Sequence, residues 1–322
     1  MAIKLYALPG LLRGFYRRNR VFLIPVLVSG FVLCFPNSIS AGAGVIITPL
    51  KGTVPFSDTS GTFSPLPAPE KGDWLAENEE KGQTFEQFRT GIRNEVDDER
   101  TTIYLQPIWN FKSGNGPPLE YLKKFTEVYF SLPVEMKRPI HPSEKKFSMR
   151  INPNSYNLQA NADRILKYLM ERVPPRAYCI LGITMVDLYP DPLWNYVFGY
   201  ATYMDRVGVF SFARYSPTFY NVSEESNPRL LFLRCCKILA HETGHMFGMA
   251  HCIDYRCVMN GCNSIKENDA QPIHLCPVCL EKLQCATSFD IDKRYKALAA
   301  FYKATGLVEE ARWVENRCKS LK

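Results

Sequence analysis

Residues 241–252 read His-Glu-Thr-Gly-His-Met-Phe-Gly-Met-Ala-His-Cys and hold three of the chain's five histidines. On a helix, His241 and His245 lie one turn apart on the same face, so both imidazoles can reach one metal ion. Gly248 allows the chain to leave that helix at a positive φ, and the return brings His251 to a third ligand position. Three protein ligands with a fourth position open to water are typical of a catalytic zinc site.

Glu242 follows the first histidine and is rotated off the line of the two helical ligands. A carboxylate in this position can accept a proton from a zinc-bound water, as a general base does. The pattern HExxH also occurs on ordinary surface helices, where it has no metal to bind. Gly248 and His251 are two further geometric requirements, and together they favour the metal site over the surface helix.

Four cysteines follow with an equally specific spacing, C-x4-C and then C-x2-C. They are Cys252, Cys257, Cys276 and Cys279. Two close pairs across a short loop are typical of a four-thiolate zinc site, whereas the alternatives are two disulfide bonds or thiols that merely pack in a core. The compact second pair favours a metal, so we expect a structural zinc ion on a segment shared with His251. Met259 is placed either as an apolar floor beneath the catalytic zinc or as an ordinary core residue.

These residues resemble the archaemetzincin family, a branch of the metzincin clan of zinc metallopeptidases. The match runs through HExxHxxGxxH, the cysteine directly after the third histidine, C-x4-C, the methionine and C-x2-C. It continues in residues 182–190 and 207–215, and it covers the chain from Trp74 to its end but not the first fifty residues.

The resemblance implies an α/β metzincin-like catalytic domain, with a mixed twisted sheet and packed helices above a zinc cleft and a helical lower subdomain clipped by zinc. It implies two Zn²⁺ ions, one catalytic and one structural, and a peptide or protein substrate. It also implies that the three histidines bind the catalytic ion, Glu242 is the base, the four cysteines bind the structural ion and Met259 forms the Met-turn. Some other metzincins have a tyrosine two residues after that methionine; Gly261 stands here, which excludes a tyrosine ligand or oxyanion donor from this position.

Two alternatives stay open from the residues alone. The first is an aminopeptidase, or a peptidase whose third ligand is a distant glutamate such as Glu267; the local third ligand His251 disfavours the distant one. The second is a zinc-structured binding protein with little turnover, which would have no need of Glu242. Exo- and endopeptidase action differ in the depth of the cleft, which the sequence does not determine.

The net charge of +7 does not indicate a nucleic-acid partner. Residues 1–50 hold five Lys and Arg residues and no acid, so the rest of the chain has 34 basic groups against 32 acidic ones. That remainder has no basic stripe of the kind that binds a phosphate backbone, and we expect no nucleic-acid binding.

The N-terminus carries conflicting signals about location. Residues 17–43 combine basic residues, an apolar run and small residues, as a secretory signal does. Residues 21–50 resemble an imperfect membrane anchor, which normally needs about 20 steadily apolar residues, so we expect membrane contact only if they are retained as an anchor. The odd number of cysteines, with Cys179 and the pair Cys235-Cys236 resembling buried thiols, argues against export. The resemblance to the archaemetzincins also implies an intracellular protein. Together these observations favour the cytoplasm, or also the nucleus, over a membrane-anchored or secreted form.

Three segments are expected along the chain. Residues 1–50 form the basic and apolar N-terminal segment, residues 51–100 an acidic extension rich in Pro and Gly that wraps or dangles, and residues 101–322 the catalytic domain, with ordered structure from near Thr101. In that domain, residues 178–186 are apolar nearly throughout, which predicts a central strand covered on both faces. We expect Val207–Ala213 to be an edge strand, either one that receives an extended substrate or an ordinary sheet edge.

Overall fold

The computed structural model describes residues 61–109, 111, 116–141, 147–220 and 227–320, so the predictions for residues 1–50 lie outside the described residues. The elements are α1 (Trp74–Glu77), α2 (Phe85–Thr90), β1 (Thr102–Ile108), α3 (Leu119–Phe130), β2 (Val134–Met136), β3 (Met149–Ile151), β4 (Leu158–Asn161), α4 (Ala162–Met170), β5 (Ala177–Thr184), β6 (Asp187–Tyr189), β7 (Gly199–Thr202), β8 (Val207–Ser211), α5 (Pro228–Met246), α6 (Ile265–Ala270), α7 (Pro277–Thr287), α8 (Ile291–Ala304) and α9 (Val308–Ser320). Among these helices, none combines the length and the apolar character needed to cross a bilayer.

The main sheet has five strands in the order β2-β1-β5-β8-β7, and a smaller sheet has the order β3-β4-β6. β1, β2, β5 and β8 run parallel, and β7 pairs antiparallel with β8. The predicted mixed α/β architecture is therefore confirmed. The prediction that Val207–Ala213 is an edge strand is wrong, because β8 lies between β5 and β7. A tight turn in which Arg206 has a φ of 59° folds β7 back over that edge, so β7 is the outer strand.

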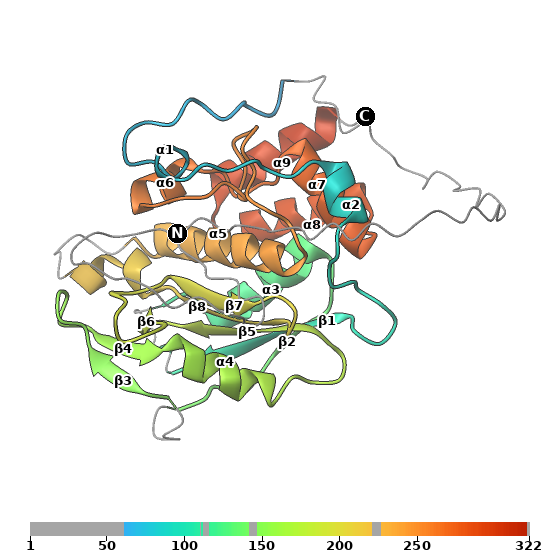
Figure 1. The fold of residues 1–322 in the computed structure, drawn as a ribbon. Helices are drawn as coiled ribbons and strands as arrows, with labels where there is room; N and C mark the ends of the chain where they lie inside the picture. Colours follow the sequence, from blue (N-terminus) through green and yellow to red (C-terminus); the bar gives the residue numbers. More distant parts are fainter. Residues whose placement is uncertain (1–60, 110, 112–115, 142–146, 221–226, 321–322) are drawn as a thin grey trace, which may run out of the picture.

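Helices cover both faces of the main sheet (Figure 1). All eight residues of β5 are buried, as predicted for a central strand. Leu181 and Ile183 belong to one apolar core with Ile238 of α5, whereas Ile180 belongs to a second core with Ile165 of α4. Because successive side chains of a strand point to opposite faces, one strand contributes to both cores. α5 lies between the sheet and the C-terminal helices α8 and α9 (Figure 1).

Side-chain caps begin several helices, among them α4, α5 and α8. The Asn227 side chain accepts a hydrogen bond from the Leu230 amide at 3.1 Å, and Pro228 occupies the first turn of α5. Asn161 caps α4 and Asp290 caps α8 in the same way. Each cap satisfies an amide that has no partner inside its helix, which fixes the start of the helix that carries the HExxH motif.

The segment before β1 is folded, so the prediction that ordered structure begins near Thr101 is wrong. Thr84 and Gln87 form a capping box that starts α2. Trp74 and Phe88 are buried, the second in the main core. The prediction relied on the overall composition of the segment, which is acidic and rich in Pro and Gly. That composition gives little weight to the few large apolar residues whose burial anchors the segment. It crosses the C-terminal helices, with α1 beside α6 and α2 beside α7 (Figure 1).

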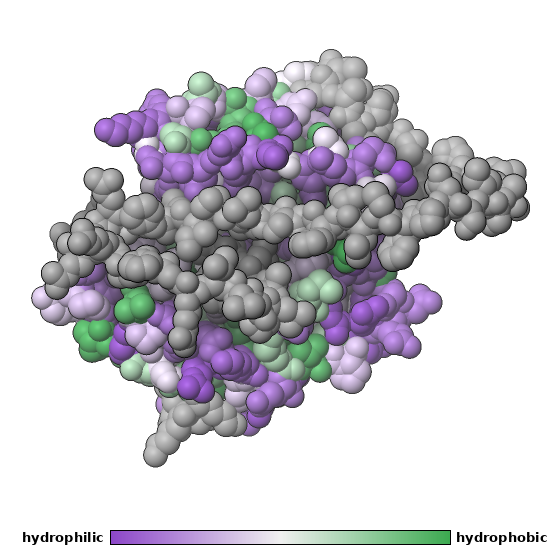
Figure 2. Space-filling model, in the orientation of Figure 1, coloured by the Kyte–Doolittle hydropathy of each residue, from purple (hydrophilic) through white to green (hydrophobic). Residues whose placement is uncertain are grey.

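The surface on the face drawn in Figure 2 is mostly hydrophilic where it is described, and its hydrophobic residues lie in small separate groups. Scattered apolar residues of this kind are normal for a protein surface. The large apolar side chains are instead in the two cores.

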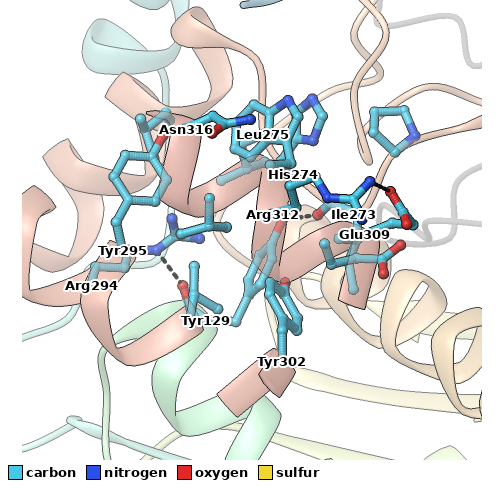
Figure 3. Close-up of a pocket in the computed structure, with 16 residues that line it drawn as sticks. Tyr129, Ile273, His274, Leu275, Arg294, Tyr295, Tyr302, Glu309, Arg312 and Asn316 are labelled. Carbon is cyan, nitrogen blue, oxygen red and sulfur yellow. Dashed lines mark hydrogen bonds and ion pairs between the residues drawn. The ribbon is translucent and has the colours of Figure 1, made fainter. Parts of the chain in front are cut away.

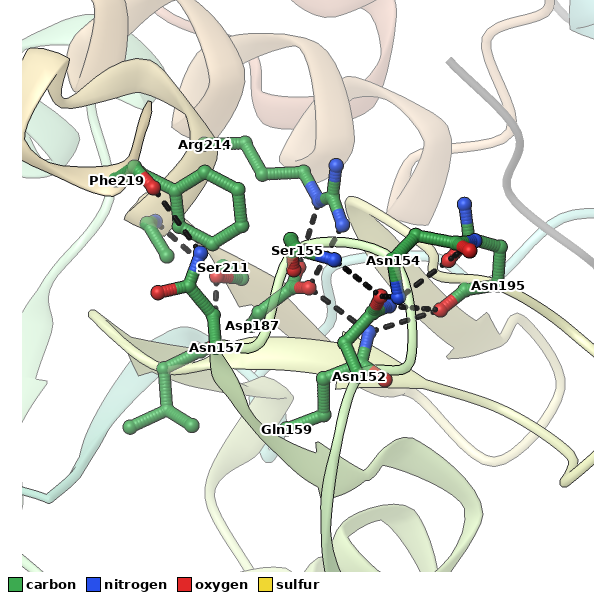
Figure 4. A network of polar contacts seen from close by, with 12 residues as sticks. Asn152, Asn154, Ser155, Asn157, Gln159, Asp187, Asn195, Ser211, Arg214 and Phe219 are labelled. Atoms are coloured by element: carbon green, nitrogen blue, oxygen red, sulfur yellow. Dashed lines mark hydrogen bonds and ion pairs between the residues drawn. The ribbon is translucent and has the colours of Figure 1, made fainter. Parts of the chain in front are cut away.

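A buried ion pair joins the small sheet to the 3-10 turn at Ala213–Tyr215, which follows β8 (Figure 4). Arg214 donates to both carboxylate oxygens of Asp187 at 2.8 Å, and Gln159 of β4 donates to Asp187 Oδ2 at 2.8 Å. The Arg214 guanidinium also stacks 3.3 Å from the centre of the Tyr196 ring. Asp187 and Arg214 are 1% and 8% exposed, so each needs the other as a counter-charge.

We predict that Asp187→Ala lowers the free energy of unfolding by about 3–5 kcal/mol, because it leaves the Arg214 charge buried without a partner. Urea denaturation measures the change. The matched control is Asp163→Ala, which removes a solvent-exposed pair with Lys167 and should cost no more than about 1 kcal/mol. Equal effects of the two substitutions would contradict the assignment of Asp187–Arg214 as a structural pair.

Candidate metal centre

The end of α5 and the loop that follows it bring three histidines together. His241 and His245 lie on α5, and Gly248, with a φ of 84°, turns the chain out of the helix as the sequence predicts. His251 then returns toward the helix, and one ring nitrogen of each histidine lies within 4.8 Å of the others. The three residues singled out by their spacing are therefore neighbours in the fold.

Hydrogen bonds determine which nitrogen of each helical histidine faces the cluster. Nδ1 of His241 is 2.8 Å from the carbonyl oxygen of Val258, and Nδ1 of His245 is 2.7 Å from that of Met249. A carbonyl oxygen only accepts, so each Nδ1 donates and each Nε2 keeps a free lone pair. The two Nε2 atoms are 3.0 Å apart, close to the about 3.3 Å expected for two nitrogens bound to one tetrahedral zinc.

Burial keeps these two rings neutral. It lowers the pKa of His241 well below its usual value, and it lowers the pKa of His245 to about 3, with repulsion from His251 as the next cause. Neutral imidazoles with free Nε2 lone pairs are the form of histidine that binds metal ions.

His251 is oriented by a residue that the sequence analysis missed. Its Nδ1 lies 2.7 Å from Oε1 of Glu80, which also accepts a hydrogen bond from the Trp74 indole at 2.9 Å. Because the carboxylate occupies Nδ1, Nε2 of His251 is the nitrogen left for the cluster. Glu80 is 171 residues away in the chain, and no local pattern marks it among the other acids of its segment.

Glu242 is 1% exposed, and its Oε1 has no hydrogen-bond partner among the described residues. Burial raises the pKa of this carboxyl well above its usual value. An unpaired polar atom inside a protein is costly, which makes such an atom a candidate for a functional role.

The four cysteines also come together, and all are buried. The Sγ atoms of Cys252 and Cys276 are 3.6 Å apart. A disulfide requires about 2.05 Å, whereas two sulfurs bound to one tetrahedral zinc are about 3.8 Å apart. Hydrogen bonds from the three other thiols lower the pKa of Cys252. None of the described cysteines forms a disulfide, so the spacing of the sulfurs favours the metal over the two-disulfide alternative.

Met259 lies between the two clusters and is fully buried. A Cβ atom on Gly244 would be 2.5 Å from its sulfur, so Met259 packs directly against α5 between the two helical histidines. Its carbonyl oxygen accepts a hydrogen bond from the Cys252 amide at 2.9 Å. This contact connects Met259 to the cysteine cluster.

Glu267, the alternative third ligand, lies outside the histidine cluster. Its Oε1 accepts a hydrogen bond from the Trp74 amide at 2.8 Å, and its Oε2 accepts one from the Asn263 amide at 2.6 Å. Both oxygens thus hold the backbone of neighbouring segments. The structure places His251, and not Glu267, beside the helical histidines.

A separate cavity of about 400 Å³ lies between the loop before α7 and helices α8 and α9 (Figure 3). Three of its charged groups have partners: Arg294 donates to the carbonyl oxygen of Tyr129 at 2.7 Å, and Arg312 pairs with Glu309 at 2.8 Å. None of the clustered histidines lines it. This cavity therefore belongs to the packing of the helical part and not to the candidate metal centre.

Comparisons with known proteins assign the sequence to a class of enzyme. Residues 150–285 match the profile of Peptidase family M54. The chain is 38% identical over 271 residues to Archaemetzincin-2 of Homo sapiens, covering 76% of this chain and 75% of the relative. It is 32% identical over 268 residues to Archaemetzincin-1 of Mus musculus, covering 74% of this chain and 53% of the relative. A solved archaemetzincin from Methanopyrus kandleri is 26% identical, with 59% of this chain and 97% of that chain covered and a TM-score of 0.45.

The class is thus that of the metallopeptidases. The chain belongs to the archaemetzincin family, and the family resemblance noted in the sequence is confirmed.

We predict that Gly261→Ala destabilises the protein through Trp74. A Cβ atom at residue 261 would be 2.4 Å from Cδ1 of the indole, and overpacking of this kind costs about 1–3 kcal/mol. In a Trp74→Ala background the same substitution should cost much less, because the clash is gone. A double-mutant cycle in urea measures the coupling, and an equal cost in both backgrounds would contradict the close contact.

Proposed function

We propose that this chain is a zinc-dependent peptidase whose catalytic ion is held by His241, His245 and His251. The observation that carries this proposal is the direction of the three rings. Each Nδ1–H donates away from the cluster, which leaves the three Nε2 atoms as the nitrogens that face it. This donor set suits zinc, and three protein ligands leave a position for water and substrate. The substrate is a peptide or a protein.

Glu242 is the general base in this proposal. Zinc in such a site polarises the scissile carbonyl and lowers the pKa of water. Oε1 of Glu242 has no partner in the described structure and is free to take one proton from the attacking water. The water oxygen bonds to the carbonyl carbon, and Glu242 then gives the proton to the amine nitrogen as the C–N bond breaks. The carboxylate is regenerated, and one water is consumed per peptide bond.

We also infer a second, structural zinc at Cys252, Cys257, Cys276 and Cys279. Backbone amides point at two of these sulfurs, from Cys276 to Cys257 Sγ at 3.3 Å and from Cys279 to Cys276 Sγ at 3.4 Å. Such amides stabilise the negative charge of thiolates. An ion here would connect the loop after His251 to the start of α7. Met259 then supplies the apolar floor between the two sites.

An aminopeptidase is the alternative that uses the same chemistry. Acetylating the N-terminus of a test peptide distinguishes an aminopeptidase from an endopeptidase, because only the aminopeptidase needs the free amine. A binding protein without turnover is the alternative outside it. We further propose a cytoplasmic location, without nucleic-acid partners and with membrane contact only if residues 21–50 are retained.

We predict that Glu242→Gln keeps its zinc and its stability but lowers kcat at least about 100-fold, the usual contribution of a general base. Peptide hydrolysis and zinc content are measured on the same full-length samples. Glu120→Gln, which changes an exposed acid on α3, should behave as the unchanged protein. Full turnover by the zinc-loaded Glu242→Gln protein would rule out the proposed base.

We predict two zinc ions per full-length chain by elemental analysis. His245→Ala and Cys276→Ala should each retain one, and chelator should lower the melting temperature of His245→Ala, because a structural zinc contributes folding free energy. Cys285→Ala removes an exposed cysteine outside the cluster and should retain both ions. Two ions in Cys276→Ala would show that the cysteine cluster holds none.

A further inference from the structure

The three histidines of the metal centre are not oriented in the same way. His241 and His245 donate to backbone carbonyls that lie within 17 and 4 residues along the chain, inside or beside the motif. His251 donates instead to a carboxylate from a segment 171 residues away. A carboxylate differs from a carbonyl in carrying a full negative charge, so it changes both the orientation and the electrostatics of the ligand.

Glu80 is held in place for this contact. Its side chain is 22% exposed, and its Oε1 accepts hydrogen bonds from both His251 and the Trp74 indole. Trp74 is fixed in turn, because its amide donates to Glu267 and its ring packs against Gly261. The indole also meets the His251 ring edge-on, with the ring centroids 5.2 Å apart. Two side chains of the same segment therefore fix the position of one ligand.

Gln83 fastens the same segment to the loop that carries His251. Its Nε2 donates to the Gly248 carbonyl at 3.1 Å, and its Oε1 accepts from the Ala250 amide at 3.1 Å. Lys282 of α7 donates to the Gln83 carbonyl oxygen. Gln83 thus binds the backbone of the loop, and Glu80 binds the side chain of His251 in the same loop.

We propose that Glu80 is a positioning residue of the catalytic metal site, and that residues 74–83 are an integral part of that site. This inference rests on the proposed zinc site at the three histidines. Glu80 holds His251 in the Nδ1–H form with Nε2 directed at the ion, and its charge makes that nitrogen a stronger donor. It also reduces the formal charge of the ion and its surroundings by one, which favours binding of a divalent cation.

The test compares Glu80→Gln with Glu79→Gln in the full-length protein. Glutamine keeps an oxygen that can accept from His251 but removes the charge. We expect Glu80→Gln to weaken zinc binding at the histidine site by about 10- to 100-fold in a chelator competition, the usual effect of losing such a partner. Glu79→Gln, an exposed neighbour, should bind zinc as the unchanged protein does.

Two further measurements separate positioning from a general loss of structure. Glu80→Asp keeps the charge and should recover part of the affinity. With Co²⁺ in place of zinc, Glu80→Gln should alter the visible bands of the histidine site, while the thiolate-to-cobalt absorption of the cysteine site stays unchanged. Trp74→Phe removes the indole donor to Glu80 and keeps an aromatic ring. It should lower zinc affinity by a smaller factor, and it is the second variant if Glu80→Gln does not fold.

The outcomes distinguish this inference from the function on which it rests. If His245→Ala loses no metal, the histidine site itself is wrong. If His245→Ala loses one ion but neither Glu80→Gln nor Trp74→Phe changes zinc affinity, the site stands and the role of Glu80 is overturned.

Discussion

The hydrogen bond on Nδ1 of each clustered histidine is the constraint on which the candidate site depends, because it determines where each Nε2 points. The three acceptors come from three different parts of the fold. Met249 belongs to the turn that ends α5, Val258 to the loop held by the cysteines, and Glu80 to the N-terminal segment. Two of these acceptors therefore lie within or beside the eleven-residue motif, and the third comes from a segment 171 residues away.

The two clusters depend on each other through the backbone. Cys252 directly follows His251, and Cys257 directly precedes Val258, whose carbonyl orients His241. The Cys252 amide donates to Met259, which packs under α5. An ion at the cysteines would therefore hold both the third ligand and the acceptor of the first one. Such an ion would add an anchor to a loop that has few of its own, because the buried apolar residues between Cys252 and Asn260, apart from cysteine, are Val258 and Met259.

What could be predicted from the sequence was local. The exit at Gly248 and the buried central strand each follow from the chemistry of a few neighbouring residues, and the structure has both, with the strand β5 ending at Thr184 instead of residue 186. The order of β7 and β8 in the sheet was not predictable in this way. Their hairpin determines that the two strands pair with each other, but not which of them also pairs with β5. Glu80 was hidden for a similar reason, since one acid among many in a polar segment acquires its role only through a contact across 171 residues.

Gly261 shows that a residue near the motif is nevertheless required for this long-range contact. In the sequence it appears only as the absence of a tyrosine. In the fold its missing side chain makes room for the Trp74 indole, whose Nε1 would be 2.5 Å from a Cβ atom at this position. The same Nε1 donates to Glu80, which in turn accepts from His251. A residue of any size at 261 would displace the indole and, with it, the carboxylate. The glycine is thus a requirement of the N-terminal segment, and the metal-site loop is shaped to receive that segment.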